Sequence, residues 1–135
     1  MSIPTKTIEQ LTHLAREASV RAYAPYSHFR VGAALAAQSG AMFSGCNVEN
    51  AAYGLTNCAE RTAIFSMVAA GETSFEAIVV YTPTEKPIAP CGACRQVLFE
   101  FNPDAEMISV CDGTEIFRTS VRDLLPEAFG PKSLT

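Results

Sequence analysis

The sequence lacks the features that mark several classes of protein. No apolar run reaches the roughly 18 residues that a membrane-spanning helix requires. Residues 1–6 lack the apolar stretch of a secretory signal. The basic residues are scattered and the net charge is −4, so the chain has no basic stripe of the kind that binds nucleic acid. We therefore expect a soluble, cytoplasmic protein that acts on a small molecule, with no nucleic-acid or membrane partner.

Internal repeats, low-complexity tracts and linkers are also missing. The chain has 135 residues, 48% of them hydrophobic, which is ordinary for a globular protein with one core. We expect a single domain over residues 1–135. The five cysteines are an odd number, which in a reducing compartment argues against a disulfide framework.

Three of the cysteines and one glutamate form the most informative pattern that is present. The run Cys58-Ala59-Glu60 is followed by Pro90-Cys91-Gly92-Ala93-Cys94. Three thiolates can hold one zinc ion and leave its fourth position open for water, which distinguishes a catalytic zinc from a structural one. The same spacing, with an all-cysteine ligand set, is a signature of zinc deaminases.

Both cysteine runs coincide with predicted helix starts. A helix N-terminus lowers a thiol's pKa and favours the thiolate that zinc requires. Glu60, at the start of the first of these helices, can take a proton from the zinc's water and return it to a substrate. Three thiolates leave the metal centre anionic, so we expect a cation nearby. Arg61 is the expected hydrogen-bond donor to a thiolate sulfur, and Arg95 is a further candidate.

The periodicity and the turn residues predict an α/β fold. Helices are expected over about 7–23, 58–70 and 91–101, strands over 30–37, 42–46, 75–81, 107–111 and 115–118, and a short closing helix over 121–125. Thr7 and Ser120 are the expected caps of the first and last helices. This order predicts a three-layer α-β-α sandwich around one mixed five-stranded sheet.

Beyond the cysteines, the chain resembles the small homotetrameric, zinc-dependent cytidine deaminases over essentially its whole length. The matching runs are APYS (24–27), FRVGAA (29–34), GCNVENAAYG (45–54), CAER (58–61) and PCGACRQ (90–96). The resemblance implies hydrolysis of cytidine and 2′-deoxycytidine to the uracil nucleosides with release of ammonia, in pyrimidine salvage. It also implies a homotetramer with shared active sites.

The resemblance further implies the role of each matching residue. Cys58, Cys91 and Cys94 would bind one Zn²⁺ per chain, and Glu60 would be the catalytic proton shuttle. The substrate would be bound by six residues: Asn47 and Glu49 at the ribose hydroxyls, Phe29 stacked near the base, Ala59 through its backbone, and Tyr53 and Phe129 at a neighbouring subunit's site.

Elementary chemistry agrees with the implied sugar contacts. An amide offers both a donor and an acceptor, as in Asn47, and the carboxylate of Glu49 accepts hydroxyl protons. A buried Glu49 would also repel a phosphate and so favour nucleosides over nucleotides. The plainer interpretations are turn chemistry for Asn47 and Glu49, core packing for Phe29, and an exposed helix-start carboxylate for Glu60.

Three other functions stay open on the sequence. A related deaminase of a nucleoside antibiotic such as blasticidin S shares the Cys-Ala-Glu and Pro-Cys-x-x-Cys parts, although Asn47 and Glu49 favour cytidine. A structural zinc module would need a fourth ligand, and Cys111, His13 and His28 are poorly placed to supply one. A polynucleotide deaminase is disfavoured by the acidic charge and the all-cysteine ligand set.

Overall fold

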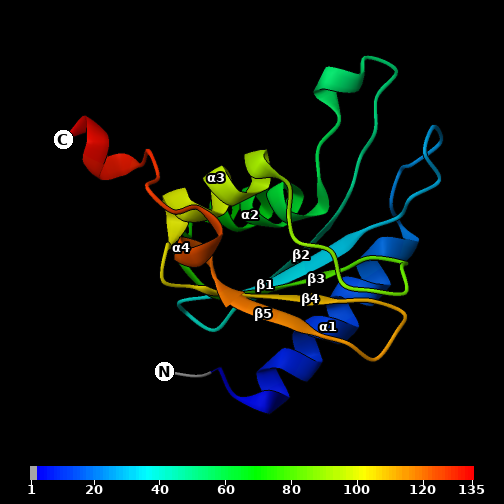
Figure 1. Cartoon of the computed structure of the whole chain (residues 1–135), viewed down its shortest axis with the longest axis horizontal. Coiled ribbons are helices and arrows are strands. Elements are labelled where there is room, and N and C mark those ends of the chain that lie inside the picture. Colours follow the sequence, from blue (N-terminus) through cyan, green and yellow to red (C-terminus); the bar gives the residue numbers. More distant parts are fainter. Residues whose placement is uncertain (1–2) are drawn as a thin grey trace.

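Five strands form one mixed sheet with helices on both of its faces (Figure 1). The computed structural model of the chain describes residues 3–135. The elements in chain order are α1 (Thr5–Val20), β1 (Gly32–Ala37), β2 (Met42–Cys46), η1 (Tyr53–Leu55), α2 (Ala59–Ala69), β3 (Phe75–Tyr81), α3 (Gly92–Phe101), β4 (Glu106–Val110), β5 (Phe117–Ser120), α4 (Val121–Leu124) and η2 (Pro131–Leu134). The predicted sandwich is confirmed.

The strand order across the sheet is β2-β1-β3-β4-β5. Only the β3–β4 pair is parallel in the described part of the chain; the other pairs are antiparallel. A parallel pair needs a long crossover, and α3 provides it. The order places β3 in the middle, as its apolar run predicts. Helices α2 and α3 lie side by side on one face of the sheet (Figure 1).

The sheet separates two apolar cores. Strand β1 contributes to both, because successive side chains point to opposite faces. Ala34 and Ala36 pack in the core beneath α1, whereas Leu35 and its neighbours pack with residues of α2 and α3. Alanine has little strand propensity, but in β1 its small side chain allows helices to approach both faces closely. Among the helices of residues 3–135, none combines the length and apolar character needed to cross a bilayer.

The predicted ends of the first helix are wrong. The helix begins at Thr5 rather than Thr7, because Pro4 stands at the N-cap and its carbonyl accepts the amide of Ile8 at 3.2 Å. Thr7 therefore lies inside the helix and does not cap it. The helix ends at Val20 because Tyr23 instead forms a parallel bridge with Val48.

The last strand is displaced from its predicted place, and the helix after it is confirmed. Strand β5 pairs with β4 in a register that sets Phe117 opposite Ser109 and Ser120 opposite Glu106, so the strand begins two residues later than expected. Ser120 caps α4 as predicted, since its Oγ accepts the amide of Asp123 at 3.1 Å. The 3-10 turn η2 was not predicted.

Close backbone contact between β1 and α1 depends on Gly32. A Cβ atom at this position would lie 1.8 Å from the carbonyl oxygen of Ala15 and 2.7 Å from the amide nitrogen of Ser19. Both neighbours are backbone atoms of a helix, so they cannot move aside as a flexible side chain can. Only glycine allows the helix to lie this close to the strand.

We expect Gly32→Ala to lower the free energy of unfolding by about 3 kcal/mol, because the added methyl group must push α1 off the sheet. Urea unfolding followed by circular dichroism measures the change. Gly54→Ala is the matched control, since a Cβ there meets nothing within 4 Å; it should stay within about 0.5 kcal/mol of the parent protein. Equal stability of the two variants would contradict the close-contact argument.

Candidate active site

Three cysteine sulfurs converge where α2 and α3 begin. Cys58 is the N-cap of α2, Cys91 is the N-cap of α3, and Cys94 lies in the first turn of α3. Their Sγ atoms all lie within 4.8 Å of one another, and those of Cys58 and Cys91 are 3.8 Å apart. Within residues 3–135 no other group of His, Cys, Asp or Glu side chains is placed to hold a metal ion.

The sulfur geometry fits a zinc ion. A tetrahedral ion with Zn–S bonds of about 2.3 Å has ligand sulfurs about 3.8 Å apart, which is the separation of Cys58 and Cys91. A disulfide would need about 2.05 Å. No fourth side chain joins this group among the described residues, so the cluster is positioned to hold one metal ion with one ligand position left over.

The protein environment favours the thiolate form of Cys58 even without a bound metal ion. Hydrogen bonds from the Cys94 thiol and the Arg61 guanidinium lower the pKa of Cys58 to about 5, although partial burial opposes the shift. The pKa of Cys94 moves the other way, raised by its hydrogen bond to Cys58 and by burial. The Cys94 thiolate therefore needs a bound metal ion, as expected of a metal site.

Arg61 supplies the positive charge at the cluster. Its Nη2 donates to Cys58 Sγ at 3.3 Å, and this bond raises the pKa of the guanidinium above its usual value. Arg95 does not contact the sulfurs; its Nε donates to Pro90 O at 2.7 Å and its Nη1 to Leu124 O at 3.1 Å. The prediction of a compensating cation is therefore wrong for Arg95, which instead ties the loop before Cys91 to α4.

Glu60 is a buried carboxylate beside the sulfur cluster. It lies in the first turn of α2 and is only 5% exposed, so the plain interpretation of an exposed helix-start glutamate is wrong. Burial, and then the negative charge of Cys58, raise its pKa to about 7. A carboxyl group with this pKa can both accept and donate a proton near neutral pH.

A cavity of about 270 Å³ opens at the cluster and brings together six of the predicted site residues. These are Phe29, Asn47, Cys58, Ala59, Glu60 and Cys91. Phe29 comes from the loop after α1 and Asn47 from the loop after β2, and these two loops meet the starts of α2 and α3 here. The wall also includes Val80, Ile88 and Pro90, which give it an apolar side.

Asn47 is fixed by the backbone of the same region. Its Oδ1 accepts the amide of Val31 at 2.9 Å, and its Nδ2 donates to the carbonyl of Phe29 at 2.7 Å. The side chain keeps one N–H and one lone pair for a ligand. Asn47 therefore holds the loop that carries Phe29, which sequence reasoning did not predict, and still has polar capacity toward the cavity.

Glu49 lies at the protein surface, outside the cavity wall. Its Oε1 accepts the amides of Tyr26 at 3.0 Å and Ser27 at 3.2 Å, and its Oε2 accepts the Ser27 hydroxyl. The Ser27 hydrogen bond is the main reason that the pKa of Glu49 is lowered. In the single chain the Glu49 side chain is partly exposed. The prediction that Glu49 is buried, from which phosphate repulsion was expected, is therefore wrong for the single chain.

Tyr53 and Phe129 do not reach the cavity. They are 76% and 61% exposed. Tyr53 lies in η1, at the tip of a loop that stands away from the sheet, and Phe129 lies in the C-terminal segment that extends from the other side of the molecule (Figure 1). The Tyr53 ring packs edge-on against the exposed ring of Tyr26, with ring centroids 6.1 Å apart.

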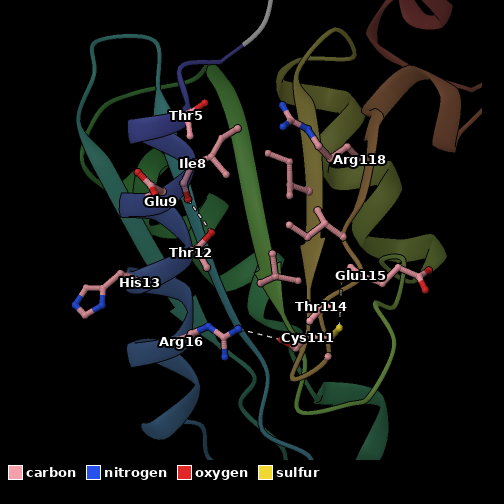
Figure 2. A pocket seen from close by; sticks show the side chains of 14 residues that line it. Thr5, Ile8, Glu9, Thr12, His13, Arg16, Cys111, Thr114, Glu115 and Arg118 are labelled. Atoms are coloured by element: carbon pink, nitrogen blue, oxygen red, sulfur yellow. Dashed lines mark hydrogen bonds between the residues drawn. The ribbon is translucent and has the colours of Figure 1, made fainter.

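A second, larger cavity of about 550 Å³ lies on the opposite face of the sheet, between α1 and strands β4 and β5 (Figure 2). Its floor is apolar, with Ile8 and Ile108, and Arg16 crosses its end to donate to Cys111 O at 2.9 Å. Among the described residues it holds no metal-ligand group. A choice by cavity volume alone would therefore select this cavity instead of the smaller one at the cysteine cluster.

A family model described as the cytidine and deoxycytidylate deaminase zinc-binding region matches residues 5–110. The chain belongs to this family. It is 46% identical over 129 residues to a cytidine deaminase of Sporosarcina psychrophila, covering 95% of both chains. The crystal structure of a Burkholderia pseudomallei cytidine deaminase superposes with a TM-score of 0.87 at 53% identity, covering 90% of this chain and 98% of that one. That of Mycobacterium tuberculosis gives 0.77 at 36% identity, with coverage of 91% and 97%.

Sequence reasoning missed two polar residues that organise this deaminase site. Ser27 holds Glu49, and the only signal was its place in the APYS run. Thr62 accepts a hydrogen bond from Asn57 at 3.1 Å and donates to the carbonyl of Cys58 at 3.2 Å, which joins the substrate-side loop to the start of α2. Neither role follows from the chemistry of serine or threonine alone.

We expect Arg61→Ala to lower zinc affinity by about 10- to 100-fold, because the Cys58 thiolate loses its hydrogen-bonded cation. Competition with a chromophoric chelator measures this affinity. Arg30→Ala is the matched control, since Arg30 donates to the carbonyl of Val20 on the surface and should have no effect on zinc. Equal zinc affinity in the parent protein and the Arg61 variant would contradict a role for this contact.

Proposed function

We propose that the protein is a cytidine deaminase that hydrolyses cytidine and 2′-deoxycytidine to uridine and 2′-deoxyuridine, releasing ammonia. The observation that carries the proposal is the buried Glu60 carboxyl, with a pKa near 7, beside a three-sulfur group at a cavity of about 270 Å³. The names of the relatives point to the same reaction.

Cys58, Cys91 and Cys94 would hold the zinc ion. Bound there, zinc supplies a Lewis acid that makes water easier to deprotonate. Arg61 donates a hydrogen bond to Cys58 Sγ and so reduces the negative charge that this sulfur donates to the metal. The N-terminal ends of α2 and α3 add partial positive charge on the same side of the cluster.

Glu60 carries the proton in each half of the reaction. It takes one proton from water as the water oxygen forms a bond to C4 of the pyrimidine, and it gives that proton to N3. It then relays the second proton of the former water, which is still on the oxygen bound to C4, to the C4 amine. The C4–N bond breaks, ammonia leaves, and C4 becomes the carbonyl of uracil. A pKa near the working pH serves both transfers.

The remaining cavity residues bind and orient the nucleoside. Phe29 and the apolar wall take the base, and the buried backbone of Ala59 at the start of α2 contacts its polar edge. Asn47 and Glu49 take the ribose hydroxyls, each with hydrogen-bond capacity that the protein does not use. The convergence of Phe29, Asn47 and Ala59 from separate segments on one cavity supports this assignment, and Glu49 lies in the same loop as Asn47.

The exposed aromatics support a shared site in a homotetramer. Tyr53 and Phe129 would each cover a neighbouring subunit's cavity, which removes both rings from water and closes the site against solvent. We further propose one domain over residues 1–135 and a cytoplasmic role in pyrimidine salvage. The cysteines, all unpaired in the described chain, suit a reducing compartment.

The test of this proposal is the loss of cytidine absorbance. The parent protein should deaminate cytidine, a chelator should abolish the activity, and added zinc should restore it. Glu60→Gln should lower kcat by about 10²- to 10⁴-fold, because the amide cannot take up or relay the proton. The variant should keep one zinc per chain by atomic absorption.

The matched control is Glu76→Gln, which makes the same substitution at an exposed glutamate of β3 and should leave kcat unchanged. Blasticidin S in the same assay distinguishes the antibiotic deaminases and should be turned over far more slowly than cytidine. A Glu60 variant with more than about a tenth of the parent rate would exclude the proton-shuttle role.

We expect the parent protein to have a mass of about 58 kDa by light scattering, four times the 14.5 kDa of one chain. Phe129→Ala should weaken this assembly or lower kcat/KM, since it uncovers a neighbouring site. Ile116→Ala is the control, because it truncates an exposed apolar side chain at the far cavity. A parent protein of 14.5 kDa would contradict the tetramer.

A further inference from the structure

Ser27 joins two of the proposed substrate residues through hydrogen bonds. Its Oγ donates to Glu49 Oε2 and accepts the amide of Phe29 at 3.0 Å. Its own amide and that of Tyr26 donate to Glu49 Oε1 at 3.2 and 3.0 Å. One turn of the chain therefore aims three donors at a single carboxylate and fixes the next aromatic residue with the same side chain.

The backbone of this turn is shaped for these contacts. His28 has a φ of 59°, a left-handed conformation that side chains other than glycine seldom adopt. Its amide donates to the carbonyl of Ala24 at 2.9 Å, so the turn folds tightly back on itself. This conformation returns the Phe29 amide to the Ser27 oxygen. Strain of this kind is concentrated at functional sites.

Counting lone pairs shows what remains for a ligand. An ionised carboxylate has about four acceptor positions, and three donors of residues 26 and 27 occupy Glu49. One acceptor position is left. Asn47 likewise has one free N–H after its bonds to Val31 and Phe29. The pair can thus take one hydroxyl that donates to Glu49 and one oxygen that accepts from Asn47.

We propose that Ser27 is a positioning residue that holds Glu49 in place for a sugar hydroxyl. The inference deepens the proposed function and depends on it. The carboxylate is partly exposed, so without Ser27 it would have to be ordered each time a nucleoside binds, and prior ordering removes that cost. Ser27 touches no reacting atom, and its effect should be confined to binding of the sugar.

The test compares two nucleosides in Ser27→Ala. For cytidine, KM should rise about tenfold while kcat stays within about threefold, because one charge-assisted hydrogen bond to Glu49 is lost. For 2′,3′-dideoxycytidine, which lacks both hydroxyls, the Ki as a competitive inhibitor should stay within about twofold of the parent value. The ratio of the two constants is internal to each variant, so partial unfolding does not affect it.

Two further variants separate positioning from general loop stability. Ser39→Ala is the matched control: Ser39 Oγ accepts the amide of Ala41 two residues on, as Ser27 does with Phe29, but in the distant turn between β1 and β2. It should leave both constants unchanged. Ser27→Thr keeps the hydroxyl and should restore the cytidine KM to within about threefold of the parent value.

A double variant tests whether Ser27 acts through Glu49. In a Glu49→Gln background, Ser27→Ala should change the cytidine KM by less than about twofold, since the charged partner is already gone. The inference is overturned if Ser27→Ala raises the cytidine KM and the dideoxycytidine Ki equally, leaves both unchanged, or acts additively with Glu49→Gln. A parent protein that does not deaminate cytidine would instead overturn the proposed function.

Discussion

The structure depends on placing three mutually repelling thiolates at one point. Two helix N-termini, one guanidinium and the metal supply the opposing charge. Without the metal, the Cys94 thiol keeps its proton even beside Arg61 and the helix ends, as its raised pKa indicates. The sheet serves this requirement, since it orients α2 and α3 so that their first turns meet beside the same cavity. Burial, and then the negative charge of Cys58, raise the pKa of Glu60 beside this cluster.

Backbone proximity makes this arrangement rigid. Gly45 in β2 packs so closely on α2 that a Cβ would lie 2.5 Å from the amide of Ala63 and 2.8 Å from the carbonyl of Ala59. Thr62 adds a side-chain bond to the carbonyl of Cys58 in the same turn. The metal-binding end of α2 is therefore fixed by the sheet beneath it, which is the support that a precise ligand geometry requires.

The substrate side is built differently, from loops that hold one another. Asn47 donates a hydrogen bond to the carbonyl of Phe29, and Ser27 donates one to Glu49. A β-bridge between Tyr23 and Val48 joins the two chain segments that carry these residues. Each polar residue keeps part of its hydrogen-bond capacity free. Tyr53 and Phe129 are exposed and lie apart from the cavity in a single chain, which is why we propose that the closed site forms in an assembly of several copies.

The sequence by itself determined the order of the helices and strands and the set of zinc ligands. Helix starts, apolar strand segments and the spacing of thiol ligands are all local properties of the sequence. Only the tertiary structure decided which cation serves the sulfurs: Arg61 and Arg95 each lie one residue after a site residue, yet one contacts sulfur and the other binds carbonyls. The same holds for the burial of Glu60 and the role of Ser27. These depend on contacts between distant segments, which no local pattern encodes.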